Sequence, residues 1–184
     1  MNRGLPPIPE SDGLTLETER LDLIPITREH APEMFEVFND SRLYEFTEGA
    51  PPADVESLAR LYEYWERRIS PDGSELWLNW AVRLKATDQW IGHVQAGVEV
   101  NHANMAWVLG SAWQRQGYAT EAARVVLDWL IQLGVGEVRA SIHPAHIASI
   151  KIAERLGLQR TAETSGIERI WKSTYTDTSS APRP

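Results

Sequence analysis

The order of strand-like and helix-like segments constrains the fold of this chain more than any other feature of its sequence. Three segments rich in apolar and aromatic residues, 76–84, 90–100 and 105–109, are separated by short runs of turn residues. Such connections are typical of neighbouring antiparallel strands. A helical stripe over 119–133 and a short apolar segment at 138–142 come next. A strand, a helix and a strand in this order predict a right-handed crossover and one parallel pair.

Further helices and strands are predicted on both sides of this centre. They are, in chain order, a strand over 21–26, a helix over 31–38, a helix over 55–69, a helix over 147–156 and strands over 158–162 and 167–173. We therefore expect an α+β fold of three layers. Its mixed, mostly antiparallel central sheet has about six or seven strands and is flanked by about four helices.

The two ends of the chain differ from its middle in composition. Residues 1–13 contain three prolines and two glycines, and residues 176–184 are rich in Ser, Thr and Pro. Neither end has a hydrophobic period, and no linker of this composition interrupts the interior. We expect a flexible N-terminal arm (1–13), a single domain (14–175) and a C-terminal tail (176–184).

The composition excludes several classes of protein. The 184 residues include no cysteine, which excludes a disulfide scaffold, a thiol nucleophile and a cysteine-ligated metal. With 18 basic and 26 acidic residues the formal charge is −8, which disfavours binding to nucleic acid or an anionic membrane. No apolar run approaches the about 18–20 residues of a membrane helix, and the first residues lack a signal-peptide core. We expect a cytoplasmic protein.

The segment Gln114–Glu121 is the strongest local indication of chemistry. It lies between a predicted strand and an amphipathic helix, where backbone N–H groups are unpaired and the helix dipole is positive. Gly117 lets the backbone approach a ligand, and Arg115 adds positive charge. These features predict a pyrophosphate site. Neither a P-loop nor a GxGxxG motif is present, which excludes these two kinds of phosphate site. Alternatively, Gly117 serves only to relax the turn between strand and helix.

A second segment lies about 30 residues further on, and the two together resemble a known family. In the first, Gln114, Gly117 and Ala119 stand at the spacing of motif A of the GCN5-related N-acetyltransferases (GNAT). In the second, Ser149 and the run Glu154–Leu158 match motif B. The sequence around Gly117 and the residues 16–21 are similar to the Rim-type branch of this family, which is named for ribosomal-protein N-terminal acetyltransferases.

The resemblance implies a GNAT-like fold and an acetyl-CoA-dependent N-acetyltransferase. The acceptor would be a primary amine: a peptide N-terminus, an amino acid or a small amine. A homodimer is also plausible. Acetyl-CoA would place its pyrophosphate on the turn and its pantetheine arm along a bulged strand at Trp107–Leu109. The implied contacts are Trp107, Val108, Leu109, Gln114, Arg115, Gln116, Gly117, Tyr118, Ala119, Thr120, His146 and Ser149.

The chain departs from the family at positions that matter for proton transfer. Ala153 stands where many members have a tyrosine acid, so the resemblance points to Ser149 as the donor to sulfur. His146 replaces the motif-B asparagine and is alternatively a simple helix-start residue. Asn104 stands where the Rim-type branch has a glutamate base, and Asn cannot take a proton.

Three residues near Asn104 are candidates for the missing base. They are Glu99, His93 and His102. Strand alternation places His93 and Glu99 on one face with Gln95 and Gly97. We name Ser149, Asn104 and Glu99 as candidate catalytic residues. The departures also leave open a module that binds acetyl-CoA without transfer, or a plain nucleotide-binding protein.

The last candidates in the sequence are the acceptor contacts and a metal site. In this family the first two helices and their loop cover the acceptor, which makes candidates of Tyr44, Glu45, Phe46, Glu48, Trp65, Tyr62 and Tyr64, although each is also compatible with an ordinary packing or loop role. The spacing of His143 and His146 suggests a metal pair, but no third ligand is evident, and no metal is predicted.

Overall fold

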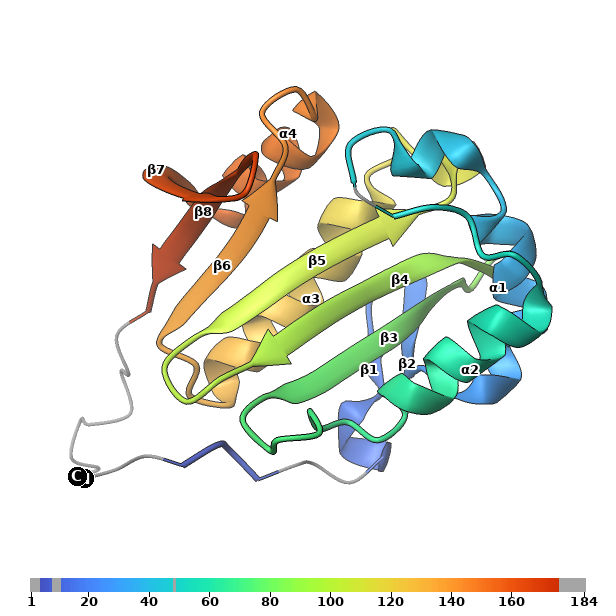
Figure 1. The fold of residues 1–184 in the computed structure, drawn as a ribbon, viewed down its shortest axis with the longest axis horizontal. Coiled ribbons are helices and arrows are strands. Elements are labelled where there is room, and N and C mark those ends of the chain that lie inside the picture. The colour runs from blue at the N-terminus through green and yellow to red at the C-terminus, as the bar shows by residue number, and fades with distance from the viewer. Residues whose placement is uncertain (1–3, 8–10, 48, 176–184) are drawn as a thin grey trace.

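The computed structural model describes residues 4–7, 11–47 and 49–175, and its centre is a mixed β-sheet (Figure 1). The described strands lie in the order β1-β2-β3-β4-β5-β6-β8-β7. Their bounds are β1 Leu16–Glu17, β2 Leu21–Pro25, β3 Leu76–Leu84, β4 Gln89–Val98, β5 Ala103–Leu109, β6 Glu137–Ile142, β7 Gln159–Ser165 and β8 Glu168–Thr174. Only β5 and β6 pair in parallel. The predicted mixed, mostly antiparallel sheet is confirmed.

The sheet contains one strand more than the sequence indicates. This strand, β1, has two residues, Leu16 and Glu17, which pair with Leu23 and Asp22 of β2. Two residues are too few to show a hydrophobic alternation, so β1 leaves no periodic signal in the sequence.

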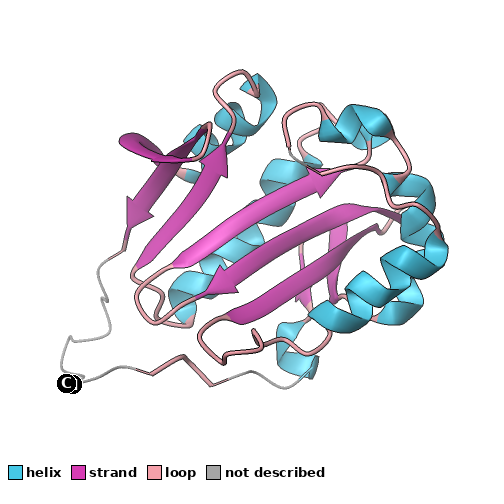
Figure 2. Ribbon diagram, viewed as in Figure 1, coloured by secondary structure: helices cyan, strands magenta, loops and turns pink. Residues whose placement is uncertain are grey.

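Helices cover both faces of the sheet. The α-helices are α1 Ala31–Phe38, α2 Val55–Trp65, α3 Tyr118–Gln132 and α4 Ile147–Leu156. Figures 1 and 2 show α1 and α2 on one face and α3 on the other, which gives the predicted three layers. Among the described residues, no helix combines the length and the apolar character that crossing a membrane would require.

The hydrophobic core has two parts, one on each face. The larger part packs β-sheet residues such as Trp80 against α3 residues such as Leu127. The smaller part packs Ala81 of β3 against Met34 and Tyr62 of α1 and α2. Neighbouring strand residues point to opposite faces, so Trp80 and Ala81 belong to different parts.

The second helix is shorter than the sequence predicts. The apolar period extends to Ile69, but α2 ends at Trp65. Arg68 has φ of 59°, a left-handed conformation that a right-handed helix cannot contain. Ile69 instead forms an isolated antiparallel bridge with Leu76. The expected helix over 55–69 is therefore wrong in its last four positions.

The parallel strands β5 and β6 pair over only a short stretch. Ala103 pairs with Val138 and Asn104 with Arg139. Beyond these pairs the two strands no longer pair with each other, although β5 stays paired with β4 and β6 with β8. Figure 1 shows them separating toward the ends from which the chain leads into α3 and α4. We call the region beyond the Asn104–Arg139 pair, between Met105–Leu109 and the end of β6, the β5–β6 wedge.

Candidate active site

The edge of β5 that faces the wedge carries backbone groups that β6 does not pair. The N–H of Gly110 donates to the carbonyl of Ile91 at 2.9 Å, which ties this position to β4. Residues along an antiparallel strand alternate between facing one neighbour and the other. The backbone N–H and C=O groups of Trp107 and Leu109 are therefore directed toward the wedge, as an added extended chain would require.

The expected bulge in Trp107–Leu109 is wrong. The register between β4 and β5 runs without a shift from the Gly92–Leu109 pair to the start of β5. The irregularity lies one strand away, where Trp90 and Gly92 pair with successive residues of β3 and leave Ile91 as the extra residue. The strand that borders the wedge is regular, and its neighbour carries the bulge.

The turn before α3 has the conformation of an anion-binding loop. Arg115 and Gly117 both have left-handed backbones, with φ of 62° and 85°. Gly117 is the N-cap of α3, and no side chain caps this end of the helix. Residues 114–117 are exposed. The exposed turn and the uncapped first amides of α3 can therefore hold an anion, because unpaired N–H groups at a helix N-terminus attract negative charge.

Two glutamines of the turn make contacts within it. The Gln114 side-chain amide donates to the Leu109 carbonyl at 3.1 Å and so ties the turn to the end of β5. The Gln116 side chain donates to the Ala112 carbonyl at 3.3 Å. Both side chains fix the shape of the turn, which leaves its backbone to meet a ligand.

The connection between β1 and β2 braces this turn from the side. Arg20 donates through Nε to Glu121 Oε2 at 2.7 Å and through Nη1 to the Gln116 carbonyl at 3.2 Å. Thr18 donates to the other Glu121 oxygen at 2.6 Å. Burial alone would raise the pKa of Glu121, but the Thr18 and Arg20 hydrogen bonds outweigh it and lower this pKa. The carboxylate is thus ionised and neutralised by Arg20, beside a turn suited to anions.

Replacing Arg20 by alanine is expected to weaken acetyl-CoA binding about tenfold, because Glu121 would present an uncompensated negative charge to the turn. Isothermal titration would measure the dissociation constant. Arg28→Ala is the matched control. Arg28 has the same side-chain exposure of 42% and forms an ion pair with Glu56 of α2. Adding Glu121→Gln should recover part of the affinity lost in Arg20→Ala. Equal affinity of Arg20→Ala and Arg28→Ala for acetyl-CoA would contradict the role of Arg20 in neutralising Glu121.

The start of α4 brings together two of the predicted site residues. His146 is the N-cap of α4, and its Nδ1 accepts the backbone N–H of Ser149 at 3.5 Å. Burial and then His143 lower the pKa of His146, so the ring is neutral and Nδ1 can act as acceptor. The ring packs 4.7 Å from that of Phe46. The Ser149 hydroxyl is not the group that caps the helix.

A polar cluster lies at the closed end of the wedge. The Asn104 amide donates to Glu99 Oε1 at 3.4 Å and lies 3.4 Å from His102 Nε2. His102 Nε2 is 3.3 Å from the same Glu99 oxygen. The structure therefore brings Glu99, His102 and Asn104 together next to the last β5–β6 pair.

His93 lies apart from this cluster. It shares its sheet face with Gln95 and Gly97, but its ring is in the layer under α1, 4.7 Å from Phe38 and 5.7 Å from Trp65. Only 8% of its surface is exposed. Burial lowers the pKa of His93 to about 4, so it is a neutral and weak base at physiological pH.

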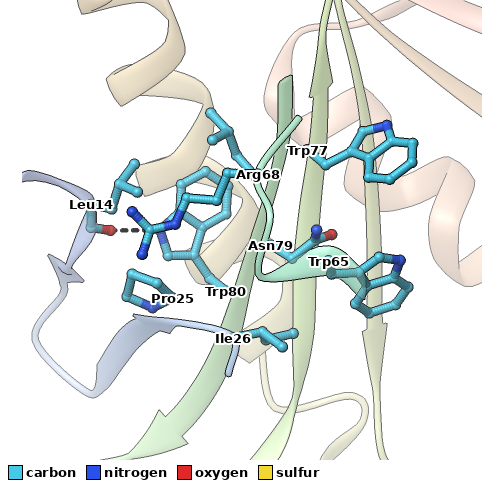
Figure 3. Close-up of a pocket in the computed structure, with 9 residues that line it drawn as sticks. Leu14, Pro25, Ile26, Trp65, Arg68, Trp77, Asn79 and Trp80 are labelled. Atoms are coloured by element: carbon cyan, nitrogen blue, oxygen red, sulfur yellow. Dashed lines mark hydrogen bonds between the residues drawn. The ribbon is translucent and has the colours of Figure 1, made fainter. Parts of the chain in front are cut away.

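A cleft opens on the α1–α2 face of the sheet beside Asn104. Its volume is about 200 Å³, and it is lined by Trp65, Glu75, Trp77, Asn79, Gln95, Ala96, Gly97 and Asn104. Figure 3 shows Trp65, Trp77 and Asn79 on one side of β3 and Trp80 on the other. The pocket drawn there, which shares Trp65, Trp77 and Asn79 with the cleft, has room for about 10 Å³. Glu75 could not be predicted from the sequence, because it belongs to no recognisable motif or hydrophobic pattern.

The predicted acceptor residues divide between the cleft and other places. Trp65 lines the cleft, whereas Tyr62 is buried in the smaller core. The Tyr64 ring packs 5.0 Å from Trp77. The Tyr44 hydroxyl donates to the Phe38 carbonyl at 3.1 Å, which fixes this side chain to the end of α1.

The remaining candidates are residues of the loop before α2 and the histidine pair. Glu45 is exposed, and Glu48 lies outside the described residues. The Phe46 ring lies 5.5 Å from His143, on the same side as its contact with His146. Within the described ranges, no three His, Asp or Glu side chains are placed to hold a metal ion.

Comparisons with known proteins agree with this geometry. Residues 20–159 match the model of the acetyltransferase (GNAT) domain. A search of curated proteins found no match. A Vibrio fischeri ribosomal-protein-S5-alanine acetyltransferase superposes with a TM-score of 0.72 at 17% identity, over 87% of this chain and 96% of the other.

Two further solved structures are similar in fold. An Agrobacterium tumefaciens acetyltransferase superposes with a TM-score of 0.71 at 23% identity, over 92% of this chain and 96% of that one. A GNAT-family acetyltransferase from Bacillus anthracis gives 0.70 at 18% identity, over 87% and 98%. Because the family model covers most of the sequence, from β2 through α4, the chain belongs to the GNAT acetyltransferase family.

Proposed function

We propose that this acetyltransferase moves an acetyl group from acetyl-CoA directly to a primary amine: a peptide N-terminus, an amino acid or a small amine. The observation that carries the proposal is the position of the β5–β6 wedge. It runs from the anion-binding turn before α3 to the cleft beside Asn104. A donor lying along the wedge and an acceptor entering from the cleft would meet inside the wedge, between the start of α4 and the closed end.

The dimensions of the wedge suit the donor. Strand residues rise about 3.3 Å each, so the stretch from Leu109 to Asn104 is about 17 Å long. The turn at 115–120 would bind the pyrophosphate through its amides and the Arg115 charge. The backbone groups of Trp107 and Leu109 would pair with the pantetheine arm, whose bound thioester supplies an electrophilic carbonyl carbon. Val108, Tyr118 and His146 would complete the walls.

Two proton transfers are needed, one from the amine and one to the departing sulfur, and a different side chain is proposed for each. Glu99 is proposed as the acceptor of the amine proton, because its carboxylate lies beside Asn104 at the closed end. Asn104 holds that carboxylate through its amide. Ser149 is proposed to donate a proton to the departing sulfur, because its hydroxyl does not serve as the helix cap.

A thiol-release assay with acetyl-CoA and a panel of amines tests the proposal. Amine-dependent release of CoA, with the acetylated amine found by mass spectrometry, is the expected result. Acetyl-CoA binding without release for any amine would favour a binding module, the alternative that Asn104, His146 and Ala153 suggest.

The Ser149→Ala variant should lower kcat at least about tenfold, because a positioned proton donor contributes at least that much. The dissociation constant of acetyl-CoA should change little. The α4 cap should survive, since the Ser149 backbone and not its hydroxyl bonds to His146. Ser149→Thr restores a hydroxyl and should recover part of the rate. An unchanged kcat in Ser149→Ala would remove this residue from the mechanism.

A further inference from the structure

One row of residues crosses the sheet at the closed end of the wedge. Trp77 pairs with Gly97, Gly97 with Asn104 and Asn104 with Arg139. This is the last row before β5 and β6 separate. Three members of the row, Trp77, Gly97 and Asn104, also line the cleft. The cleft therefore ends where a transferred acetyl group would lie.

A carboxylate from the start of β3 lies over the middle of this row. Glu75 Oε2 accepts the indole N–H of Trp77 at 2.9 Å. A Cβ atom at position 97 would lie 1.9 Å from Glu75 Oε1, so only glycine leaves room for the carboxylate there. Gly97 pairs directly with Asn104, which places the Glu75 carboxylate next to the closed end.

Glu75 is the one charged side chain among the residues that line the cleft. Among the ion pairs of the described residues, none includes Glu75. The Asn104 amide donates to a second carboxylate, that of Glu99, at 3.4 Å. A ligand at this end thus meets negative charge from two carboxylates, which favours an ammonium group and disfavours a carboxylate.

Two indole rings form the apolar walls of the cleft. Trp65 stacks on Tyr62 at 5.5 Å, and Trp77 packs on Tyr64 at 5.0 Å, so both rings are held in place. Their faces suit a flat or aliphatic body, and indoles also attract cations. A volume of about 200 Å³ is at the small end for a ligand site.

We infer that the cleft binds the acceptor as a small primary amine without a neighbouring carboxylate, whose ammonium group is held by Glu75 and whose apolar body lies between Trp65 and Trp77. This inference rests on the proposed function and narrows it. We expect simple arylalkyl amines to be preferred over free amino acids. The α-carboxylate of an amino acid would lie against the carboxylates of Glu75 and Glu99.

Phenethylamine and phenylalanine are the matched probes, since they differ only in the carboxylate. For the wild-type protein with saturating acetyl-CoA, kcat/KM should be at least about tenfold higher for phenethylamine. Isothermal titration of both probes gives a second readout that needs no turnover. Glu75→Gln keeps the hydrogen bond from Trp77 and removes the charge. It should raise KM for phenethylamine about tenfold and reduce the preference over phenylalanine.

Two further variants separate charge at the cleft from other effects. Gly97→Ala should act like Glu75→Gln, because the new methyl group displaces the carboxylate without removing it. Glu36→Gln is the control, since Glu36 is an exposed residue of α1 outside the set that lines the cleft. Circular dichroism and an unchanged dissociation constant for acetyl-CoA would show that each variant is folded.

The outcomes of this experiment are distinct. Preference for phenethylamine that falls in Glu75→Gln and Gly97→Ala, but not in Glu36→Gln, supports the inference. Equal use and equal binding of the two probes, or a preference unchanged in Glu75→Gln, overturns it while leaving the transferase intact. Absence of turnover with any amine refutes the proposed function, and selective binding of phenethylamine that depends on Glu75 would then still support the cleft assignment.

Discussion

Replacing Gly92 by alanine is expected to lower the free energy of unfolding by about 3 kcal/mol or more. Gly92 has φ of 155°, which L-residues rarely adopt. Its Cβ would lie 2.2 Å from the Val108 carbonyl oxygen and 2.7 Å from the Leu109 Cα, both backbone atoms of β5. Neither atom can rotate away, so β5 itself would have to move.

Thermal unfolding would measure this effect, with a fall in Tm of roughly 10 °C expected for a domain of this size. Acetyl-CoA binding should weaken in parallel, because β5 forms one edge of the wedge. Gly134→Ala is the matched control: Gly134 also has a positive φ, of 90°, but its Cβ would meet nothing within 4 Å. Its cost should be limited to backbone strain of about 1 kcal/mol. Similar losses in the two variants would contradict the close approach of β4 to β5.

Acidification is expected to destabilise the protein through His93, and His93→Phe should remove much of that effect. The folded state keeps His93 neutral because burial lowers its pKa to about 4. The unfolded chain takes up the proton below about pH 6.5. Between these values the unfolded state binds more protons, so stability is lost as pH falls through this window. The full loss from this residue is about 3 kcal/mol.

Urea unfolding at about pH 7 and about pH 4.5 would measure this difference. Burial also lowers the pKa of His30 and His146, so some acid sensitivity should remain in the variant. Phenylalanine suits the site, since Phe38 and Trp65 already surround the ring. The gap in stability between the wild-type protein and His93→Phe should shrink or reverse sign on acidification. Parallel pH curves would show that His93 is not held neutral.

Local periodicity made most of the fold predictable. The segments 76–84, 90–100 and 105–109 are β3, β4 and β5 within one or two residues at most ends, because each has an alternating pattern and a turn after it. The helical stripes over 119–133 and 147–156 became α3 and α4 for the same reason. The two failures have different causes. The strand β1 is too short to show a pattern, and the apolar period that extends to Ile69 continues past the end of α2 at Trp65, before the left-handed Arg68.

The candidate site was only partly predictable, because much of it depends on contacts between distant residues. The turn at 114–120 could be found from its own composition, but its brace could not, since Arg20 and Glu121 are 101 residues apart. Alternation placed His93 and Gly97 on one face, yet it cannot give the register between strands. The register is what aligns Gly97 with Asn104 and lets Glu75 reach that row.

Thermal unfolding with acetyl-CoA, CoA, ATP and NAD at matched concentrations tests the donor site directly. A ligand at 100 times its dissociation constant adds about 2.7 kcal/mol of stability, or a shift of roughly 5–10 °C. We expect this shift with acetyl-CoA and CoA, and none with ATP or NAD, because the wedge continues the site beyond the pyrophosphate turn. Protein that is folded and free of bound ligand, yet shifts with neither CoA species, would contradict the assignment of the wedge and turn as the donor site.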